Sequence, residues 1–194
     1  MRTRSDTTTG IICLIAGIAV FSVQDLILKK LSADYPLHQA MVLRSLTALP
    51  FLLLIVWWFD GRLSTITTPG WPKMLARGLL NFVAYTSYYL GLAALPMATT
   101  IALFFTAPLF ITLSAALLFN EKVSGPAALA VLAGFAGVML IVQPGTEGLG
   151  GPAILPIAGA AGYALSMVIA RPMGRTESAA AMAFWANILS LIHI

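Results

Sequence analysis

Long apolar stretches alternate with short polar separators along the whole chain. Six of the stretches approach the roughly 20 residues that a helix needs to cross a bilayer core about 30 Å thick, and a seventh runs to the last residue. They cover residues 10–31, 38–59, 74–94, 97–119, 125–143, 152–171 and 179–194. Because the separators are short and rich in turn-forming residues, we expect successive helices to form antiparallel hairpins.

The backbone of a membrane-spanning segment must satisfy its hydrogen bonds internally, which leaves helices and closed barrels as the two solutions. Barrel strands alternate apolar and polar positions, whereas these stretches are continuously apolar. The pattern therefore predicts an all-α fold, a polytopic transmembrane helical bundle.

Composition narrows the class of protein further. Charged residues make up 9% of the 194 positions and hydrophobic ones 59%, with a mean hydropathy of +0.92, whereas a soluble domain carries roughly 25% charged residues. This excludes a water-soluble monomer and a disordered chain. The net charge of +4 is scattered between apolar blocks, which argues against a nucleic-acid partner. The single cysteine, Cys13, lies in an apolar stretch, so we expect no disulfide framework, metal site or cofactor.

The distribution of positive charge over the separators predicts an orientation. With a cytoplasmic N-terminus, eight of the 11 basic residues lie on that side: Arg2, Arg4, Arg62, Lys73, Arg77, Lys122, Arg171 and Arg175. The other three, Lys29, Lys30 and Arg44, lie opposite. The positive-inside rule then favours a multi-pass protein of the inner (plasma) membrane with its N-terminus in the cytoplasm.

A weak internal repeat relates the first and sixth stretches at an offset of 142 residues, where Ile15-Ala16-Gly17 matches Ile157-Ala158-Gly159. The offset spans five helices, an odd number, so the second copy would cross the membrane in the opposite direction. Inverted repeats of this kind are common in secondary transporters. We predict a first five-helix repeat at 10–143 and the start of a second at 152–194. Because the second stops inside its second helix, the chain is expected to be an N-terminal fragment.

A series of short motifs carries a family resemblance: Leu90-Gly91-Leu92, Ala98-Thr99-Thr100-Ile101-Ala102, Ala107-Pro108-Leu109, Glu121-Lys122, Gly134 and Gly137-Val138, together with Arg44 in the second stretch. In their order and spacing these resemble the EamA-type transporters of the drug/metabolite transporter superfamily. The resemblance implies ten helices in two inverted repeats that move metabolites by alternating access. Around the first two stretches it extends to members that take up S-adenosylmethionine or riboflavin, without defining a substrate here.

Two charged residues inside apolar stretches are candidate substrate-binding residues. Asp25 is costly to bury in a membrane unless it has a partner or a water-filled cavity; it is either a substrate or proton site, or an interfacial partner of Lys29 or Arg44. Arg44 either extends to the interface, as long basic side chains do, or binds an anionic group, which its planar fork suits.

The third stretch carries Asn81, Tyr85, Tyr88 and Tyr89 at helical spacings that share one face. Buried tyrosine hydroxyls need hydrogen-bond partners, so we expect this face to point into the bundle. It either lines a cavity for a flat or cationic metabolite or packs against other helices.

Two prolines are expected to kink their helices, Pro50 in the second stretch and Pro108 in the fourth. Each kink is either a gating hinge or a static feature of the shape. Two pairs of small residues in the fifth stretch, Ala130 with Gly134 and Ala133 with Gly137, predict close helix packing.

The predicted function is secondary transport of a small organic metabolite, by export or uptake. Coupling to an ion or a proton and pairing with a second copy of the chain are both left undecided by the sequence. The alternatives are a non-transporting membrane scaffold and a membrane-embedded enzyme. No enzyme motif is recognisable, since the two histidines, His38 and His193, stand apart and Asp25 has no partner acid. We therefore expect no catalytic residues.

Overall fold

A computed structural model describes residues 4–67, 70–142 and 151–191. These residues are mostly helical and contain no strand, which confirms the predicted all-α fold. The elements are α1 (Arg4–Asp34), α2 (Leu37–Asp60), the 3-10 turn η1 (Leu63–Ile66), α3 (Trp71–Ala94), α4 (Met97–Phe104), α5 (Ala107–Phe119), α6 (Gly125–Val142), the 3-10 turn η2 (Gly151–Ala153), α7 (Ile154–Met173) and α8 (Ala179–Ser190).

The predicted helix at 97–119 is divided into two parts, α4 and α5. The backbone N–H groups of Phe105 and Thr106 bond to carbonyls within the last turn of α4, and Pro108 lies in the first turn of α5. Proline is tolerated there because the first N–H groups of a helix have no partner within that helix. In contrast, α2 continues through Pro50 from Leu37 to Asp60.

Four segments are long and apolar enough to cross a membrane by themselves: Thr8–Asp34, His38–Asp60, Met97–Phe119 and Gly151–Met173. In the described part of the chain, α6 and α8 contain shorter apolar segments. Helix α3 has 24 residues, or about 36 Å at 1.5 Å per residue, but it carries Lys73, Arg77 and Asn81 and is not among the four. Its polar groups need partners inside the bundle.

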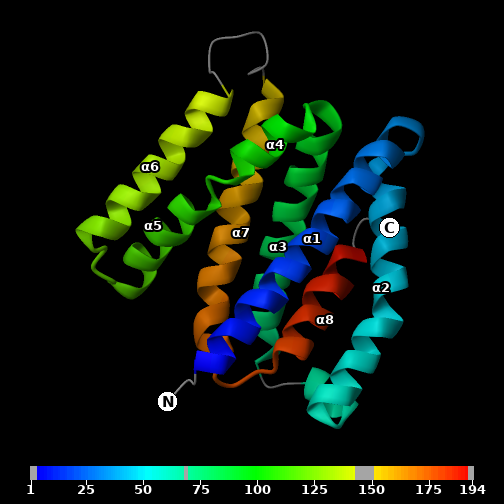
Figure 1. The fold of residues 1–194 in the computed structure, drawn as a ribbon. Coiled ribbons are helices and arrows are strands. Elements are labelled where there is room, and N and C mark those ends of the chain that lie inside the picture. Colours follow the sequence, from blue (N-terminus) through cyan, green and yellow to red (C-terminus); the bar gives the residue numbers. More distant parts are fainter. Residues whose placement is uncertain (1–3, 68–69, 143–150, 192–194) are drawn as a thin grey trace.

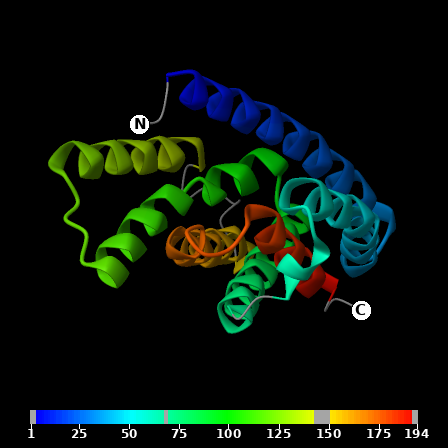
Figure 2. The ribbon, with the colours of Figure 1, turned by 90° about the horizontal axis from the view of Figure 1, so that it is seen from below.

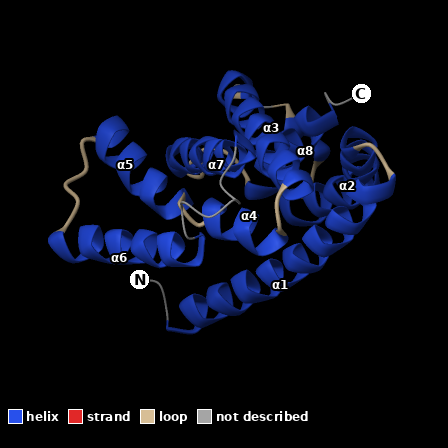
Figure 3. Ribbon diagram, turned by 90° about the horizontal axis from the view of Figure 1, so that it is seen from above, coloured by secondary structure: helices blue, strands red, loops and turns tan. Residues whose placement is uncertain are grey.

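Figure 1 shows these helices running alternately up and down, with α3 and α7 in the middle, α5 and α6 on one side and α1 and α2 on the other. Viewed from below and from above, α1 lies at the periphery (Figures 2 and 3). Its apolar side chains are largely exposed, among them Ile11, Ile15 and Ile18. The first and sixth predicted spans, α1 and α7, run in opposite directions (Figure 1).

The most extensive contact between two helices joins α3 and α7. It depends on small residues, because a Cβ added at Gly159 would lie 2.9 Å from the carbonyl oxygen of Ala84 and 3.2 Å from the amide nitrogen of Tyr88. Glycine thus lets the two backbones approach closely, as small residues do in membrane bundles. The glycines expected to pack closely, Gly134 and Gly137 on α6, have no atom of the described residues within 4 Å of an added Cβ.

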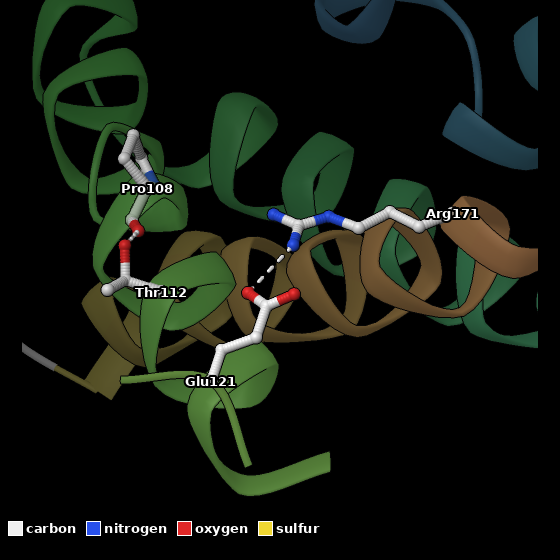
Figure 4. A network of polar contacts seen from close by, with 4 residues as sticks. All are labelled: Pro108, Thr112, Glu121 and Arg171. Atoms are coloured by element: carbon white, nitrogen blue, oxygen red, sulfur yellow. Dashed lines mark hydrogen bonds and ion pairs between the residues drawn. The ribbon is translucent and has the colours of Figure 1, made fainter. Parts of the chain in front are cut away.

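A second link to α7 comes from the end of α5. Glu121 forms an ion pair with Arg171, with 3.3 Å between Oε2 and Nη1 (Figure 4). In the same view the Thr112 hydroxyl donates to the carbonyl of Pro108 one turn earlier in α5, at 2.9 Å. Both charged side chains are about half exposed, so the pair adds at most about 1 kcal/mol.

Candidate functional site

A partly open cavity of about 350 Å³, lined by both polar and apolar side chains, lies between the helices of the first predicted repeat and those that follow it. This volume is at the lower end of the range typical of small-molecule sites. Five helices line it, α1, α2, α3, α7 and α8. The lining residues are Gln24, Arg44, Ala48, Leu52, Arg77, Asn81, Tyr85, Tyr163, Met167, Ala183, Ala186 and Asn187.

Arg44 enters the cavity from α2. Its guanidinium carbon lies 5.6 Å from the ring centroids of both Tyr85 and Tyr89, within the distance of a cation–π contact. Its Nη1 donates to the Tyr89 hydroxyl at 3.3 Å. The aromatic pair therefore fixes the direction of the guanidinium without neutralising its charge.

The candidate polar face of α3 is divided between two environments. Asn81 and Tyr85 line the cavity, while Tyr88 and Tyr89 are buried in an apolar cluster with Leu28. The division follows from the approach of α1 and α2 to the last turns of α3, where they cover two of the tyrosines.

Arg77, which the sequence pattern assigned to a boundary, lies in this cavity one helical turn before Asn81. Its Nη1 donates to the carbonyl of Met182 on α8 at 3.1 Å, and its buried Nε has no hydrogen-bond partner. The available signal was the spacing of four between positions 77, 81 and 85, which puts all three on one helical face. Tyr163 and Asn187 were also missed, because their place depends on how α7 and α8 pack.

Small polar contacts join the two sides of the cavity. The Ser166 hydroxyl on α7 donates to Asn81 Oδ1 at 2.8 Å, and both residues are buried. Asn187 Nδ2 on α8 donates to the Ser45 carbonyl on α2 at 2.9 Å, and the Ser45 and Ser190 hydroxyls are also hydrogen-bonded. These bonds satisfy polar groups that would otherwise be unpaired in an apolar environment.

Asp25 is only 3% exposed and does not line the cavity. The Tyr88 hydroxyl donates to its Oδ2 at 2.7 Å, while the buried Oδ1 accepts no hydrogen bond. Neither Lys29 nor Arg44 lies within ion-pair distance. Of the two interpretations of Asp25, the ion pair with Lys29 or Arg44 is not formed among the described residues, and a role in substrate or proton binding stays a prediction.

Lys29 instead caps the end of α3. Its Nζ donates to the carbonyls of Leu92 at 2.5 Å and Leu95 at 2.9 Å, just where the helix ends at Ala94. The carbonyls of a last helical turn have no partners within the helix and carry its partial negative charge. A lysine from α1 thus satisfies groups on α3 and holds the two helices together at this end.

Replacing Lys29 with Met is expected to lower the free energy of unfolding by about 1–2 kcal/mol, because it removes a charge-assisted cap. The measurement is thermal unfolding in detergent, followed by circular dichroism. Lys30→Met is the matched control, since Lys30 is exposed and its loss should cost less than about 0.5 kcal/mol. Equal effects of the two substitutions would show that the cap contributes nothing.

At the opposite end of the bundle, Asp60 joins two connections. Its Oδ2 accepts hydrogen bonds from Thr65 at 2.9 Å and from Ser178 at 2.6 Å. Ser178 also caps α8 by accepting from the Ala181 amide, and Trp185 donates to the Ile66 carbonyl. These hydrogen bonds therefore join the α2–α3 connection to the α7–α8 connection and the start of α8.

The fold and the cavity define a polytopic helical membrane protein. Its candidate site lies between α1, α2 and α3 on one side and α7 and α8 on the other. The chain belongs to the EamA-like transporter family, whose model matches residues 8–143. No solved structure matches the chain significantly.

Three relatives show the range of related proteins. A riboflavin transporter of Rhizobium johnstonii is 34% identical over 117 residues, which are 60% of this chain and 39% of the relative. An S-adenosylmethionine uptake transporter of Rickettsia conorii is 26% identical over 188 residues, 95% and 62% of the two chains. A pseudopaline exporter of Pseudomonas aeruginosa is 25% identical over 136 residues, 70% and 47%. The chain thus spans less than two thirds of the length of these relatives.

Proposed function

We propose that this protein is a secondary transporter that carries a small organic metabolite through the central cavity by alternating access. The observation that carries the proposal is the polar cavity itself, lined by charged, amide and phenol side chains inside an apolar bundle. Membership of a transporter family supports the same conclusion. The names of the relatives include both uptake and export, so direction is left to experiment.

Solute counterflow tests this proposal on protein that is expressed from its own gene, purified and reconstituted into proteoliposomes. Riboflavin and S-adenosylmethionine are the first probes, because relatives are named for them, followed by a panel of carboxylates and amines. A transporter gives saturable exchange of at least one solute. A scaffold gives none, a channel gives flux without saturation, and an enzyme gives a changed product, so each of these three outcomes would reject the proposal.

We further propose the inverted-repeat organisation, with a first repeat at 10–143 and a second that begins at 152. Two observations support it. The α1 and α7 helices run in opposite directions (Figure 1), and the family model ends at residue 143, just before the proposed boundary.

For the orientation, we propose a cytoplasmic N-terminus in the inner membrane. Support comes from the end of the bundle at which Arg62 lies beside the α7–α8 connection, lining the same surface hollow as Glu177. The Arg171 pair with Glu121 links two further helix ends. Four of the basic residues assigned to the cytoplasm lie in or beside the α2–α3, α5–α6 and α7–α8 connections: Arg62, Lys122, Arg171 and Arg175.

Alkaline phosphatase fused after Glu147 is expected to be active, because that position would face the outside; it lies outside the described residues. The same enzyme fused after Lys122, which is exposed before α6, is expected to be inactive. The measurement is phosphatase activity relative to fusion-protein level. The reversed pattern would place the N-terminus outside.

A further inference from the structure

Both charged side chains that line the central cavity are cations. Arg44 comes from α2 and Arg77 from α3, and the twelve lining residues include no Asp or Glu. Neither arginine forms an ion pair among the described residues, where Glu121 pairs with Arg171 and neither of those two residues lines the cavity. The cavity therefore has two positive charges without a protein counter-charge on its wall.

Both guanidinium groups keep hydrogen-bond donors available. Arginine has five N–H donors; Arg44 directs one to the Tyr89 hydroxyl, and Arg77 directs one to the Met182 carbonyl. The Nε of Arg77 is buried and has no partner. A planar fork with free donors matches the two oxygens of a carboxylate or phosphate.

Asp25 is the buried acid whose charge acts on Arg44, but it does not form an ion pair with it. Asp25 is buried outside the cavity wall and accepts from Tyr88. Tyr85 and Tyr89 hold Arg44 through their ring faces, which orients the charge but leaves its sign unchanged. A buried charge without a counter-charge is costly in a medium of low polarity, and a ligand that supplies the opposite charge recovers that cost.

We infer that the central cavity recognises solutes through an anionic group, a carboxylate or a phosphate, bound by the guanidinium groups of Arg44 and Arg77. This inference rests on the proposed function, since it names the substrate class of the same cavity. The amides of Asn81 and Asn187 and the phenol of Tyr163 line the rest of the wall and offer neutral polar contacts to the remainder of the solute. The volume of about 350 Å³ limits the solute to a small molecule.

The test uses pairs of probes that differ in the anionic group: 4-hydroxybenzoate with 4-hydroxybenzamide, and riboflavin 5′-phosphate with riboflavin. Binding is measured as ligand-dependent thermal stabilisation of the purified protein in detergent. The anionic member of at least one pair is expected to stabilise at about a tenfold lower concentration than its neutral partner, the factor that a charge-assisted hydrogen bond supplies.

Arg77→Gln and Arg44→Gln are each expected to raise the concentration needed for this stabilisation about tenfold or more. Lys73→Gln is the matched control, because Lys73 lies on the same helix one turn earlier and is exposed; it should leave the preference for the anion unchanged. Arg77→Lys keeps the charge but not the fork, and is expected to retain part of the preference. It also guards against a loss caused only by misfolding of the glutamine variant.

Equal stabilisation by the neutral members, absence of stabilisation by every anion, or an anion effect that both glutamine variants retain would each overturn the inference. Counterflow of the same probes separates this failure from failure of the proposed function. Saturable exchange of neutral or cationic solutes alone rejects the anion site and leaves the transporter. Anion binding without exchange of any solute rejects the transporter and leaves the site.

Discussion

Counterflow by an Asp25→Asn variant is expected to fall about tenfold or more while the protein remains folded in the membrane. The carboxylate is buried within α1 and has one oxygen, Oδ1, with no hydrogen-bond partner. An intramembrane charge held in this way is costly and by default marks a site of function. Asn has the same shape, and its amide oxygen can still accept from Tyr88, so the substitution removes the charge and not the packing.

Transport is measured as the initial rate of counterflow, normalised to the amount of protein reconstituted. Glu121→Gln is the control, because it neutralises an acid that is 54% exposed and pairs with Arg171 at a helix end; its rate should stay within twofold of the original. Full transport by Asp25→Asn would reject a role for the charge of Asp25 in substrate or proton binding and leave it as a partner of Tyr88 alone.

Gly159→Leu is expected to destabilise the bundle by about 3 kcal/mol or to prevent folding. Its Cβ alone would approach the Ala84 carbonyl oxygen to 2.9 Å, and backbone atoms cannot give way as a side-chain end can. The rest of the leucine would force α7 away from α3, the contact on which the cavity depends.

The measurement is the thermal unfolding midpoint in detergent, together with the amount of folded protein recovered from membranes. Gly134→Leu provides the control, since an added Cβ there has no neighbour within 4 Å and the position is exposed. It is expected to change the midpoint little. Similar losses in both variants would show that leucine is harmful in either helix and that the α3–α7 approach is not the cause.

Much of the fold could be predicted from the sequence, because apolar length dictates where helices can cross a membrane. The first predicted stretch, 10–31, lies within α1, and α6 begins at the predicted residue 125 and is helical to Val142, the last residue described before the gap at 143–150. The break between α4 and α5 could not be placed in the same way. Pro108 signals a disturbance nearby, but whether a proline kinks a helix or begins a new one depends on the hydrogen bonds around it, as the unbroken α2 at Pro50 shows.

The candidate site was less accessible to sequence reasoning. Arg44, Asn81 and Tyr85 are among the residues that line the cavity, because helical spacing and unusual polarity mark them. Their role in substrate binding stays a prediction. Arg77 was assigned to the cytoplasmic boundary since it lies near a helix end, and its contact with α8 depends on packing that the sequence does not show. The small residues of α6 leave their packing partner open, because a glycine pair reports where a helix can pack and not what it packs against, and Gly134 and Gly137 meet no described atom within 4 Å of an added Cβ.

The polar contacts of α3 also set a condition on the order in which this protein is made. Asn81 is bonded to Ser166, 85 residues later, and Arg77 to Met182, 105 residues later. At about 5–20 residues per second, a ribosome synthesises those partners roughly 4–20 s after it has synthesised Asn81 and Arg77. The polar side chains of Asn81 and Arg77 therefore lack these two partners for several seconds of synthesis, although α3 is the third helix in the chain.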